Sequence, residues 1–254
     1  MSIRLAPPFH SGLGEVAKTG LWVCSGSPVA AEILAGSGAD WLLIDGEHSP
    51  IGLETIAALL RAVQGYGVDP IVRVPVNNTA LIKQYLDLGV QNLMIPMVDS
   101  AQEAEAAVQA MHYPPRGVRG VGSALARSAR WNRVPSYLAT ASDTLTCIVQ
   151  IESAVAVEQV ADIVAVDGVD AIFIGPSDLA ASMGYLGQQS HPEVLAAVHT
   201  AISAAKAAGK YVGVNAFDEA QARVYLDAGV DFIAVGADVQ LLVKASDALV
   251  ERFN

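Results

Sequence analysis

The stretch WLLIDGEHSP, residues 41–50, decides the fold. Its first half is an apolar run that stops at Asp45, and a run of this length followed by turn residues is typical of a buried β-strand. Seven similar runs occur along the chain. They are rich in Val, Ile and Leu and do not alternate strictly, which indicates strands covered on both faces. The eight runs are LWVC (21–24), WLLID (41–45), PIVRVP (70–75), NLMIPMV (92–98), TCIVQIE (146–152), AIFIG (171–175), YVGVNAF (211–217) and FIAVG (232–236).

Amphipathic, Ala-rich segments separate these runs, among them PVAAEILAGSG (28–38), LETIAALLRAVQGYG (53–67) and PEVLAAVHTAISAAKAAG (192–209). Many end in glycine, as helices often do at their carboxyl ends. Eight strands in alternation with eight helices over about 250 residues predict an α/β fold, a (β/α)8 TIM barrel formed by a single domain, residues 1–254. A doubly wound sheet is the alternative, but no GxGxxG motif follows the first run.

The composition limits the partners of the chain. A net charge of −11 argues against nucleic acid and anionic membranes as partners. Hydrophobic residues make up 52% of the chain and charged residues only 16%. No apolar run approaches the ~20 residues that span a bilayer, so we expect subunit contacts to cover the apolar excess. The amino terminus lacks the pattern of a signal peptide, and Cys24 and Cys147 are expected to be buried free thiols of a cytoplasmic protein.

One connection breaks the rhythm of short loops. Residues 114–144, between the fourth helix and the fifth strand, are far longer than the usual 2–6 residues. Five of the ten arginines of the chain lie between Arg116 and Arg133, with no acidic residue among them. One interpretation is a set of ion pairs across a subunit interface. The other is a loop that reaches a carboxylate-bearing substrate, supplied to the neighbouring subunit.

Ionisable side chains follow several of the predicted strands. The chemistry of a barrel gathers at the carboxyl ends of its strands, so we expect these side chains to converge on one site. Each also has a structural interpretation, because an arginine in a strand can pair with a buried carboxylate and a glutamate can stabilise the start of a helix. The residues are Asp45, Glu47 and His48 after the second run, Arg73 in the third, Glu152 ending the fifth and Asp178 after the sixth.

The two carboxylates on adjacent strands, Glu152 and Asp178, predict a metal site. They are hard oxygen ligands without Cys or His at matching positions, and they leave most of a six-fold shell to water and substrate. This donor set favours Mg²⁺ or Mn²⁺, with Co²⁺ or catalytic Zn²⁺ as substitutes. The segment GPSDLA (175–180) adds backbone N–H groups, at Ser177 and Asp178, that can hold a small carboxylate beside the metal.

The lysines argue against imine chemistry. A Schiff-base enzyme needs a lysine at the active end of the barrel, and none lies at the carboxyl end of a predicted strand. Electrons that build up on a substrate must therefore be held by the metal and Arg73. The five lysines are Lys18, Lys83, Lys206, Lys210 and Lys244.

Five motifs are spread in order over nearly the whole chain: DGEH (45–48), RVP (73–75), YPPRGVRGVGSALARSARWNR (113–133), QIES (150–153) and GPSDL (175–179). Together they resemble the class II pyruvate aldolase family typified by 4-hydroxy-2-oxoheptanedioate aldolase. The resemblance implies a barrel of the phosphoenolpyruvate/pyruvate type, with its last helix exchanged between subunits in a hexamer that is a trimer of dimers. It also implies a place in the breakdown of aromatic compounds.

The resemblance implies roles for the residues of these motifs. Glu152 and Asp178 match the ligands of the divalent metal, which pyruvate chelates through its carboxylate and keto oxygens. Arg73 matches an arginine that touches the keto oxygen. Asp45 and His48 match a polar pair that takes part in proton transfer, and we expect the carboxylate to hydrogen-bond one imidazole nitrogen.

Four further residues are placed around this centre. By the same resemblance, Gln150 lies near the bound keto acid and Trp22 is an aromatic near the site. Glu47 is expected to orient its neighbours rather than to react. Asn215, in the seventh run, departs from the family pattern, since an apolar side chain is expected near the aldehyde. Succinic semialdehyde, a sugar-derived hydroxyaldehyde and an aromatic aldehyde all stay open as the second substrate.

The expected reaction is the reversible retro-aldol cleavage of a 4-hydroxy-2-oxo acid to pyruvate and an aldehyde, through an enolate held by the metal and Arg73. The sequence does not choose between His48 and a metal-bound hydroxide as the base. The alternative is another lyase on the same barrel that acts on a different 2-oxo acid or an acyl-CoA. A phosphosugar isomerase is disfavoured, because no Gly-rich phosphate loop follows the last two strands.

Overall fold

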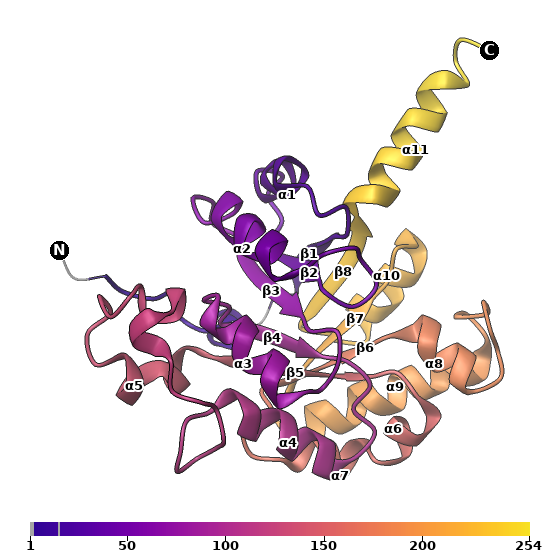
Figure 1. The fold of residues 1–254 in the computed structure, drawn as a ribbon. Helices are drawn as coiled ribbons and strands as arrows, with labels where there is room; N and C mark the ends of the chain where they lie inside the picture. The colour runs from indigo at the N-terminus through magenta and orange to yellow at the C-terminus, as the bar shows by residue number, and fades with distance from the viewer. Residues whose placement is uncertain (1–2, 15) are drawn as a thin grey trace.

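Eight parallel strands close into a barrel in the computed structural model, which describes residues 3–14 and 16–254 (Figure 1). Each strand pairs with the next along the chain, and β8 pairs with β1. The predicted (β/α)8 barrel is confirmed. The strands are β1 (Lys18–Val23), β2 (Trp41–Asp45), β3 (Asp69–Arg73), β4 (Asn92–Ile95), β5 (Thr146–Ile151), β6 (Ala171–Ile174), β7 (Tyr211–Asn215) and β8 (Phe232–Ala237).

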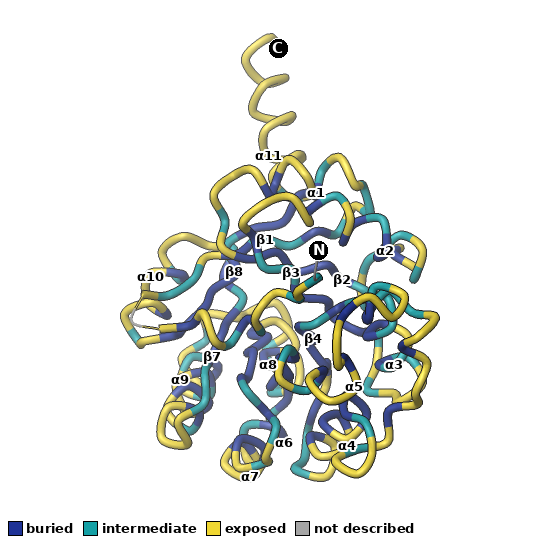
Figure 2. Tube along the Cα trace, turned by 90° about the vertical axis from the view of Figure 1, so that its left-hand side faces the viewer, coloured by how far each residue is buried: buried dark blue, intermediate teal, exposed yellow. Residues whose placement is uncertain are grey.

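Most of the helices form an outer ring whose buried faces pack on the barrel (Figure 2). Ser27, Asn78, Ser100 and Asp218 begin four of them with side-chain caps on backbone N–H groups. The helices are α1 (Pro28–Ala35), α2 (Leu53–Ala62), α3 (Thr79–Asp87), α4 (Ala101–Met111), α5 (Tyr137–Thr140), α6 (Ala154–Glu158), α7 (Val160–Ala165), α8 (Pro176–Ser182), α9 (Pro192–Ala207), α10 (Glu219–Asp227) and α11 (Asp238–Val250).

The two-residue period of the strands sorts their side chains into two layers. In β2, Leu42 and Ile44 face the helices, whereas Trp41 and Leu43 belong to a separate cluster inside the barrel. Asp45 follows in the inward phase at the carboxyl end of the strand. The same alternation brings the last inward position of the other strands to one end of the barrel.

Aromatic rings fill the interior of the barrel below that end. Phe9, Trp41, Phe173 and Phe232 contact one another with ring centroids 5.3–6.2 Å apart. Phe9 comes from a 3-10 turn, Phe9–Gly12, that closes the opposite end of the barrel. Gly20 leaves room for the indole of Trp41, because a Cβ there would lie 2.1 Å from it. The barrel is therefore packed solid except at its carboxyl end.

The long connection between α4 and β5 is folded against the body of the molecule. It contains 3-10 turns at Ser123–Leu125, Arg127–Ala129 and Ala141–Thr144 together with α5. Ala129, Val134, Tyr137 and Ala141 bury a small apolar cluster of their own. We call residues 114–144 the arginine-rich insertion.

The last helix, α11, leaves the barrel and projects from it with the carboxyl terminus at its tip (Figure 1). Its apolar side chains are exposed, with Leu242 at 72% and Phe253, just beyond the helix, at 85%. Across the described ranges, no helix has both the length and the apolar character to cross a membrane. Both cysteines are free thiols. Cys147 is buried as predicted, but Cys24 follows β1 and is half-buried, because the strand ends one residue earlier than the apolar run.

Candidate active site

A cavity of about 370 Å³ opens at the carboxyl end of the barrel. Nine of the ten predicted site residues line it, because each stands at an inward position at or just beyond the end of a strand. Glu47 is the exception and lines another cavity, between the segments that follow β3 and β4 and the start of α4. The nine residues are Trp22, Asp45, His48, Arg73, Gln150, Glu152, Ser177, Asp178 and Asn215.

Arg73, the last residue of β3, is the centre of a bonded network. Its side chain is 3% exposed. The Nε atom donates to Asp45 Oδ1 over 2.9 Å, and Nη1 lies 2.7 Å from Glu47 Oε2 and donates to Gln150 Oε1 over 3.4 Å. The guanidinium also lies over the ring of Trp22, 4.6 Å from its centroid. Four neighbours from three strands and a loop therefore fix the orientation of this cation.

Asp45 is held as a carboxylate. Burial opposes its ionisation, but the bond from Arg73 and the backbone N–H groups of Glu47 and His48 outweigh burial, so the pKa of Asp45 lies below its ordinary value. Its second oxygen accepts from Ser49 Oγ over 3.2 Å. Asp45 thus orients Arg73 and the start of the following loop.

The expected bond from Asp45 to the imidazole of His48 is absent from the described part of the chain. Asp45 contacts the backbone N–H of His48, while Nε2 of the ring lies 3.9 Å from Glu47 Oε2. The reason is geometric, since Asp45 points into the barrel and His48 stands in the loop above it with a side chain that is 69% exposed. The acidic neighbour of the imidazole is Glu47.

Glu152 follows β5 and is buried, with 3% exposure. Its Oε1 accepts from the backbone N–H of Met97 over 2.8 Å, and its Oε2 accepts from Gln150 Nε2 over 3.0 Å. Burial raises its pKa to about 7, against the pull of the Met97 N–H, and the nearby charges of Glu47 and Asp178 raise it further. Gly175 permits this packing, because a Cβ there would lie 2.8 Å from Oε2.

This arrangement fits a divalent cation. Glu152 is a buried carboxylate close to two other carboxylates, and Arg73 is already shared with Asp45 and Glu47. A cation between Glu152 and Asp178 supplies the missing positive charge, and both residues line the same cavity. No group of three or more His, Cys, Asp or Glu side chains with metal-binding geometry occurs among the residues described.

The far wall of the cavity carries polar atoms without partners. The Oδ1 atom of Asn215, the last residue of β7, is buried and accepts no hydrogen bond within the described residues, and the same holds for donation by Trp22 Nε1. Phe217 stands edge-on to the ring of Trp22, with centroids 6.1 Å apart. These atoms are available to a ligand.

The arginine-rich insertion does not reach this cavity within its own subunit. Arg119 donates to Asp87 Oδ1 over 2.9 Å, and Arg127 donates to the carbonyl of Leu88 and to Gln64. These bonds lie inside one chain, which neither of the two interpretations of the insertion foresaw. None of the described residues that line the cavity is a lysine.

Two contributors escaped the sequence analysis. Met97 takes a left-handed conformation, with φ of +50°, that turns its backbone N–H toward Glu152. Nothing in its side chain signals this role, although the proline before it marks the end of the strand. Ser49 was visible beside DGEH as a hydroxyl in the right loop, and its bond to Asp45 is the kind of contact that only coordinates reveal.

Both the sequence and the fold match known proteins. A model of the HpcH/HpaI aldolase/citrate lyase family matches residues 18–245. A 4-hydroxy-2-oxo-heptane-1,7-dioate aldolase of Salmonella dublin is 50% identical over 235 residues, which cover 92% of this chain and 89% of that protein. A HpcH/HpaI aldolase/citrate lyase family protein from Burkholderia cenocepacia J2315 is 41% identical with a TM-score of 0.92, covering 94% of this chain and 95% of that one. A HpcH/HpaI aldolase from Desulfitobacterium hafniense DCB-2 is 29% identical with a TM-score of 0.89, covering 98% and 97%.

Proposed function

The chain belongs to the HpcH/HpaI aldolase/citrate lyase family, and from this we propose that it is a class II pyruvate aldolase that cleaves 4-hydroxy-2-oxo acids reversibly to pyruvate and an aldehyde. Its relatives are aldolases, so the protein is a carbon–carbon lyase. The observation that carries the proposal is the buried Glu152, bonded through Gln150 to Arg73 in a cavity that also contains Asp178. Such a set can hold a metal and a 2-oxo acid side by side.

Glu152 and Asp178 are the proposed metal ligands, and Mg²⁺ or Mn²⁺ is the proposed ion, with Co²⁺ or Zn²⁺ as possible substitutes. Both ligands are carboxylates, which these hard cations prefer. When bound, the cation polarises the carboxylate and keto oxygens of the 2-oxo acid and so lowers the energy of the enolate. The Met97 N–H and Gln150 orient Glu152 toward the cavity.

Arg73 is the proposed partner of the keto oxygen. Its Nε and Nη1 atoms are engaged by Asp45, Glu47 and Gln150, which leaves Nη2 for the substrate. A guanidinium that is already fixed in place stabilises developing negative charge without reorganisation. Ser177, in the first turn of α8, is the proposed donor to the substrate carboxylate.

His48 is the proposed proton carrier. In cleavage, the proton of the 4-hydroxyl passes to the imidazole as the C3–C4 bond breaks, its electron pair forms the enolate of pyruvate, and the aldehyde is released. The enolate then takes a proton at C3 to give pyruvate, and aldol synthesis is the reverse. Exposure suits this role because an imidazole in contact with solvent can exchange protons, and its nearest acidic neighbour is Glu47, with Nε2 and Oε2 3.9 Å apart.

The assembly is proposed from the projecting helix. We infer that residues 1–254 form one barrel domain and that α11 packs on a second subunit, where it buries the apolar side chains now exposed on it. α1 also exposes two large apolar residues, Val29 at 66% and Ile33 at 69%. A hexamer built as a trimer of dimers agrees with this surface. The two free thiols favour a reducing, cytoplasmic location.

The decisive experiment treats the purified protein with chelator and then restores single metals. Cleavage of a 4-hydroxy-2-oxo acid, and exchange of pyruvate methyl protons with deuterium, should both disappear with chelator and return with Mn²⁺ or Mg²⁺. Inactivation by borohydride in the presence of pyruvate, with a covalent adduct on a lysine, would show imine chemistry and overturn the proposal. Full activity in chelator would overturn the metal site.

A further inference from the structure

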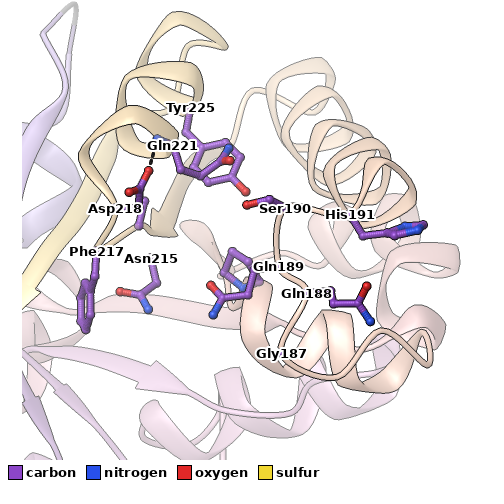
Figure 3. Close-up of a pocket in the computed structure, with 12 residues that line it drawn as sticks. Gly187, Gln188, Gln189, Ser190, His191, Asn215, Phe217, Asp218, Gln221 and Tyr225 are labelled. Carbon is purple, nitrogen blue, oxygen red and sulfur yellow. Dashed lines mark hydrogen bonds between the residues drawn. The ribbon is translucent and has the colours of Figure 1, made fainter.

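A second cavity, of about 580 Å³, adjoins the catalytic one and has no part in the mechanism above (Figure 3). It lies between the loop of residues 187–191, before α9, and the start of α10. Asn215 lines both cavities, and Pro176 of the second lies between Gly175 and Ser177 of the first. The two spaces therefore share a wall, and a ligand that leaves the catalytic cavity past Asn215 enters the second one.

Three buried polar atoms without partners surround this second cavity. They are Asn215 Oδ1, Gln221 Nε2 and Tyr225 Oη, and none has a hydrogen bond to any described residue. Tyr225 is 1% exposed. In Figure 3 the side chains of Gln221 and Tyr225 lie together on α10, and Ser190 faces them from the opposite loop. Buried polar groups of folded proteins are nearly always hydrogen-bonded, so three unpaired ones around one space point to a ligand that completes them.

The chemistry of the lining identifies that ligand. Gln221 Nε2 and Tyr225 Oη can donate and Asn215 Oδ1 can accept, and a hydroxyl group serves both kinds of partner. No lysine or arginine stands among the described lining residues, while Asp218 places a carboxylate there. The Nδ1 atom of His191 accepts a hydrogen bond from the backbone N–H of Glu193 over 3.3 Å. A carboxylate-bearing tail finds no fixed positive charge in this cavity.

We propose that the second cavity is a subsite for the acceptor, and that this acceptor is a neutral, polyhydroxylated aldehyde of the kind derived from sugars. This inference rests on the proposed aldolase function. The aldehyde carbon lies beside the enolate in the catalytic cavity, the chain passes Asn215, and its distal hydroxyls bind Gln221 and Tyr225. Gln221 and Tyr225 thereby set specificity without touching the reacting atoms. A dicarboxylic product such as the one in the name of the Salmonella dublin relative is disfavoured for this chain.

The test uses three aldehydes of four carbons each: erythrose, butanal and succinic semialdehyde. With pyruvate and Mn²⁺, kcat/KM for the wild type should be highest for erythrose. Tyr225→Phe and, separately, Gln221→Met should lower kcat/KM for erythrose roughly tenfold more than for butanal, because each removes a donor to a hydroxyl. Tyr113→Phe is the matched control. It deletes another buried, unpartnered phenol, in contact with Arg119 of the arginine-rich insertion, and should leave the ratio unchanged.

The outcomes separate this inference from the function on which it rests. If wild-type protein with metal exchanges no pyruvate protons, the aldolase function is wrong. If exchange is normal but succinic semialdehyde is the best acceptor, or if both variants lose activity equally toward all three aldehydes, the subsite alone is wrong. A change in sedimentation of Tyr225→Phe with an unaltered acceptor ratio would assign the cavity to a second copy of the chain and also overturn the subsite.

Discussion

Two buried arginines of this protein have similar surroundings, but only one of them lines the candidate active site. Arg73 at the end of β3 is 3% exposed and Arg119 in the arginine-rich insertion is 1% exposed. Each donates to an aspartate over 2.9 Å, and each lies over an aromatic ring at 4.6 Å from the centroid. Burial, pairing and stacking are therefore the same at both sites. None of these properties alone marks a functional arginine.

The difference lies in what else surrounds each guanidinium. Arg73 has two carboxylates, lines an open cavity and is linked through Gln150 to the ionisable Glu152. Arg119 has one carboxylate partner, Asp87, and donates also to Tyr137 Oη over 3.4 Å, while its Nε and Nη1 atoms have no partner among the described residues. Surplus charge beside an open space indicates chemistry, whereas a closed pair indicates the anchoring of a long loop.

The largest expected difference between the two sites is in kcat when each arginine is replaced by lysine. Arg73→Lys should lower kcat by ~10²-fold or more, because a point charge replaces the fixed planar group that stabilises the enolate. Arg119→Lys should leave kcat within about twofold, since its surroundings contain no reacting atoms. Steady-state kinetics with Mn²⁺ and a 4-hydroxy-2-oxo acid checks both. Near-normal kcat in Arg73→Lys would make Arg73 a structural residue like Arg119.

Arg119 should have little effect on kcat, but its removal should lower the stability of the fold. Arg119→Ala should lower the free energy of unfolding by about 2 kcal/mol, which is less than a fully buried pair would lose because solvent reaches Asp87. At this chain length the thermal midpoint should fall by about 5 °C. Calorimetry measures this, with kcat per folded molecule as the accompanying control. An unchanged midpoint would show that the insertion is held by its apolar cluster alone.

A further prediction concerns the unpaired Oδ1 atom of Asn215 and the choice of aldehyde. Asn215→Leu should shift relative kcat/KM toward butanal and away from erythrose by ~10-fold, the factor that about 1.4 kcal/mol of hydrogen bonding provides. Asn215 has no part in enolate formation in the proposed reaction, so pyruvate proton exchange should persist. Paired acceptor rates and deuterium exchange give the answer together. If exchange collapses while the acceptor ratio stays constant, Asn215 belongs to the pyruvate end of the site.

The smallest expected effect is on the pH dependence of stability, and it comes from His112, just before the arginine-rich insertion. Burial, with the charges of Arg116 and Arg119, lowers the pKa of His112 to about 4, below the ~6.5 of an exposed histidine. Between these values the unfolded chain binds a proton that the folded chain does not. The stability is therefore fully present above about pH 6.5 and falls as the pH drops toward 4.

Replacing this group should flatten that dependence. His112→Gln keeps a polar group near Ser142 Oγ, which lies 2.9 Å from the native Nδ1, but does not titrate. The variant should lose less stability than the wild type between pH 7 and pH 5, measured as the thermal midpoint in chelator. The exposed His199→Gln serves as the control and should follow the wild type. Parallel curves for His112→Gln and the wild type would contradict the prediction.

Much of the barrel could be predicted because buried strands announce themselves by composition. WLLID matches β2 at both ends. The apolar runs at β3, β4 and β7 overshoot, since the chain stays apolar for two or three residues past the last residue of each strand. β1 begins three residues early, at Lys18, because pairing with β8 takes in polar residues that no hydropathy pattern includes.

The candidate site was predictable for the same reason and to the same depth. Residues at inward positions after strands had to converge, so Asp45, Arg73 and Glu152 were placed correctly by topology. Which atoms meet was a different matter. The partner of the His48 ring is Glu47, and the backbone of Met97 holds Glu152, because these contacts depend on loop conformations that have no sequence period. The cavity beside Asn215 needed coordinates, since its walls come from a loop and a helix far apart in the chain.

The aromatic packing inside the barrel has a consequence for the order of events. The interior of the barrel below the catalytic cavity is filled by the rings of Phe9, Trp41, Phe173 and Phe232. Substrates and products can therefore enter and leave only through the opening at the carboxyl end. On the proposed reaction, the 2-oxo acid occupies the floor beside Glu152 and the aldehyde stands between it and solvent. Pyruvate must then bind before the aldehyde in synthesis and leave after it in cleavage. On the proposed reaction, the packed interior of the barrel therefore implies an ordered sequential mechanism, because both substrates use one opening.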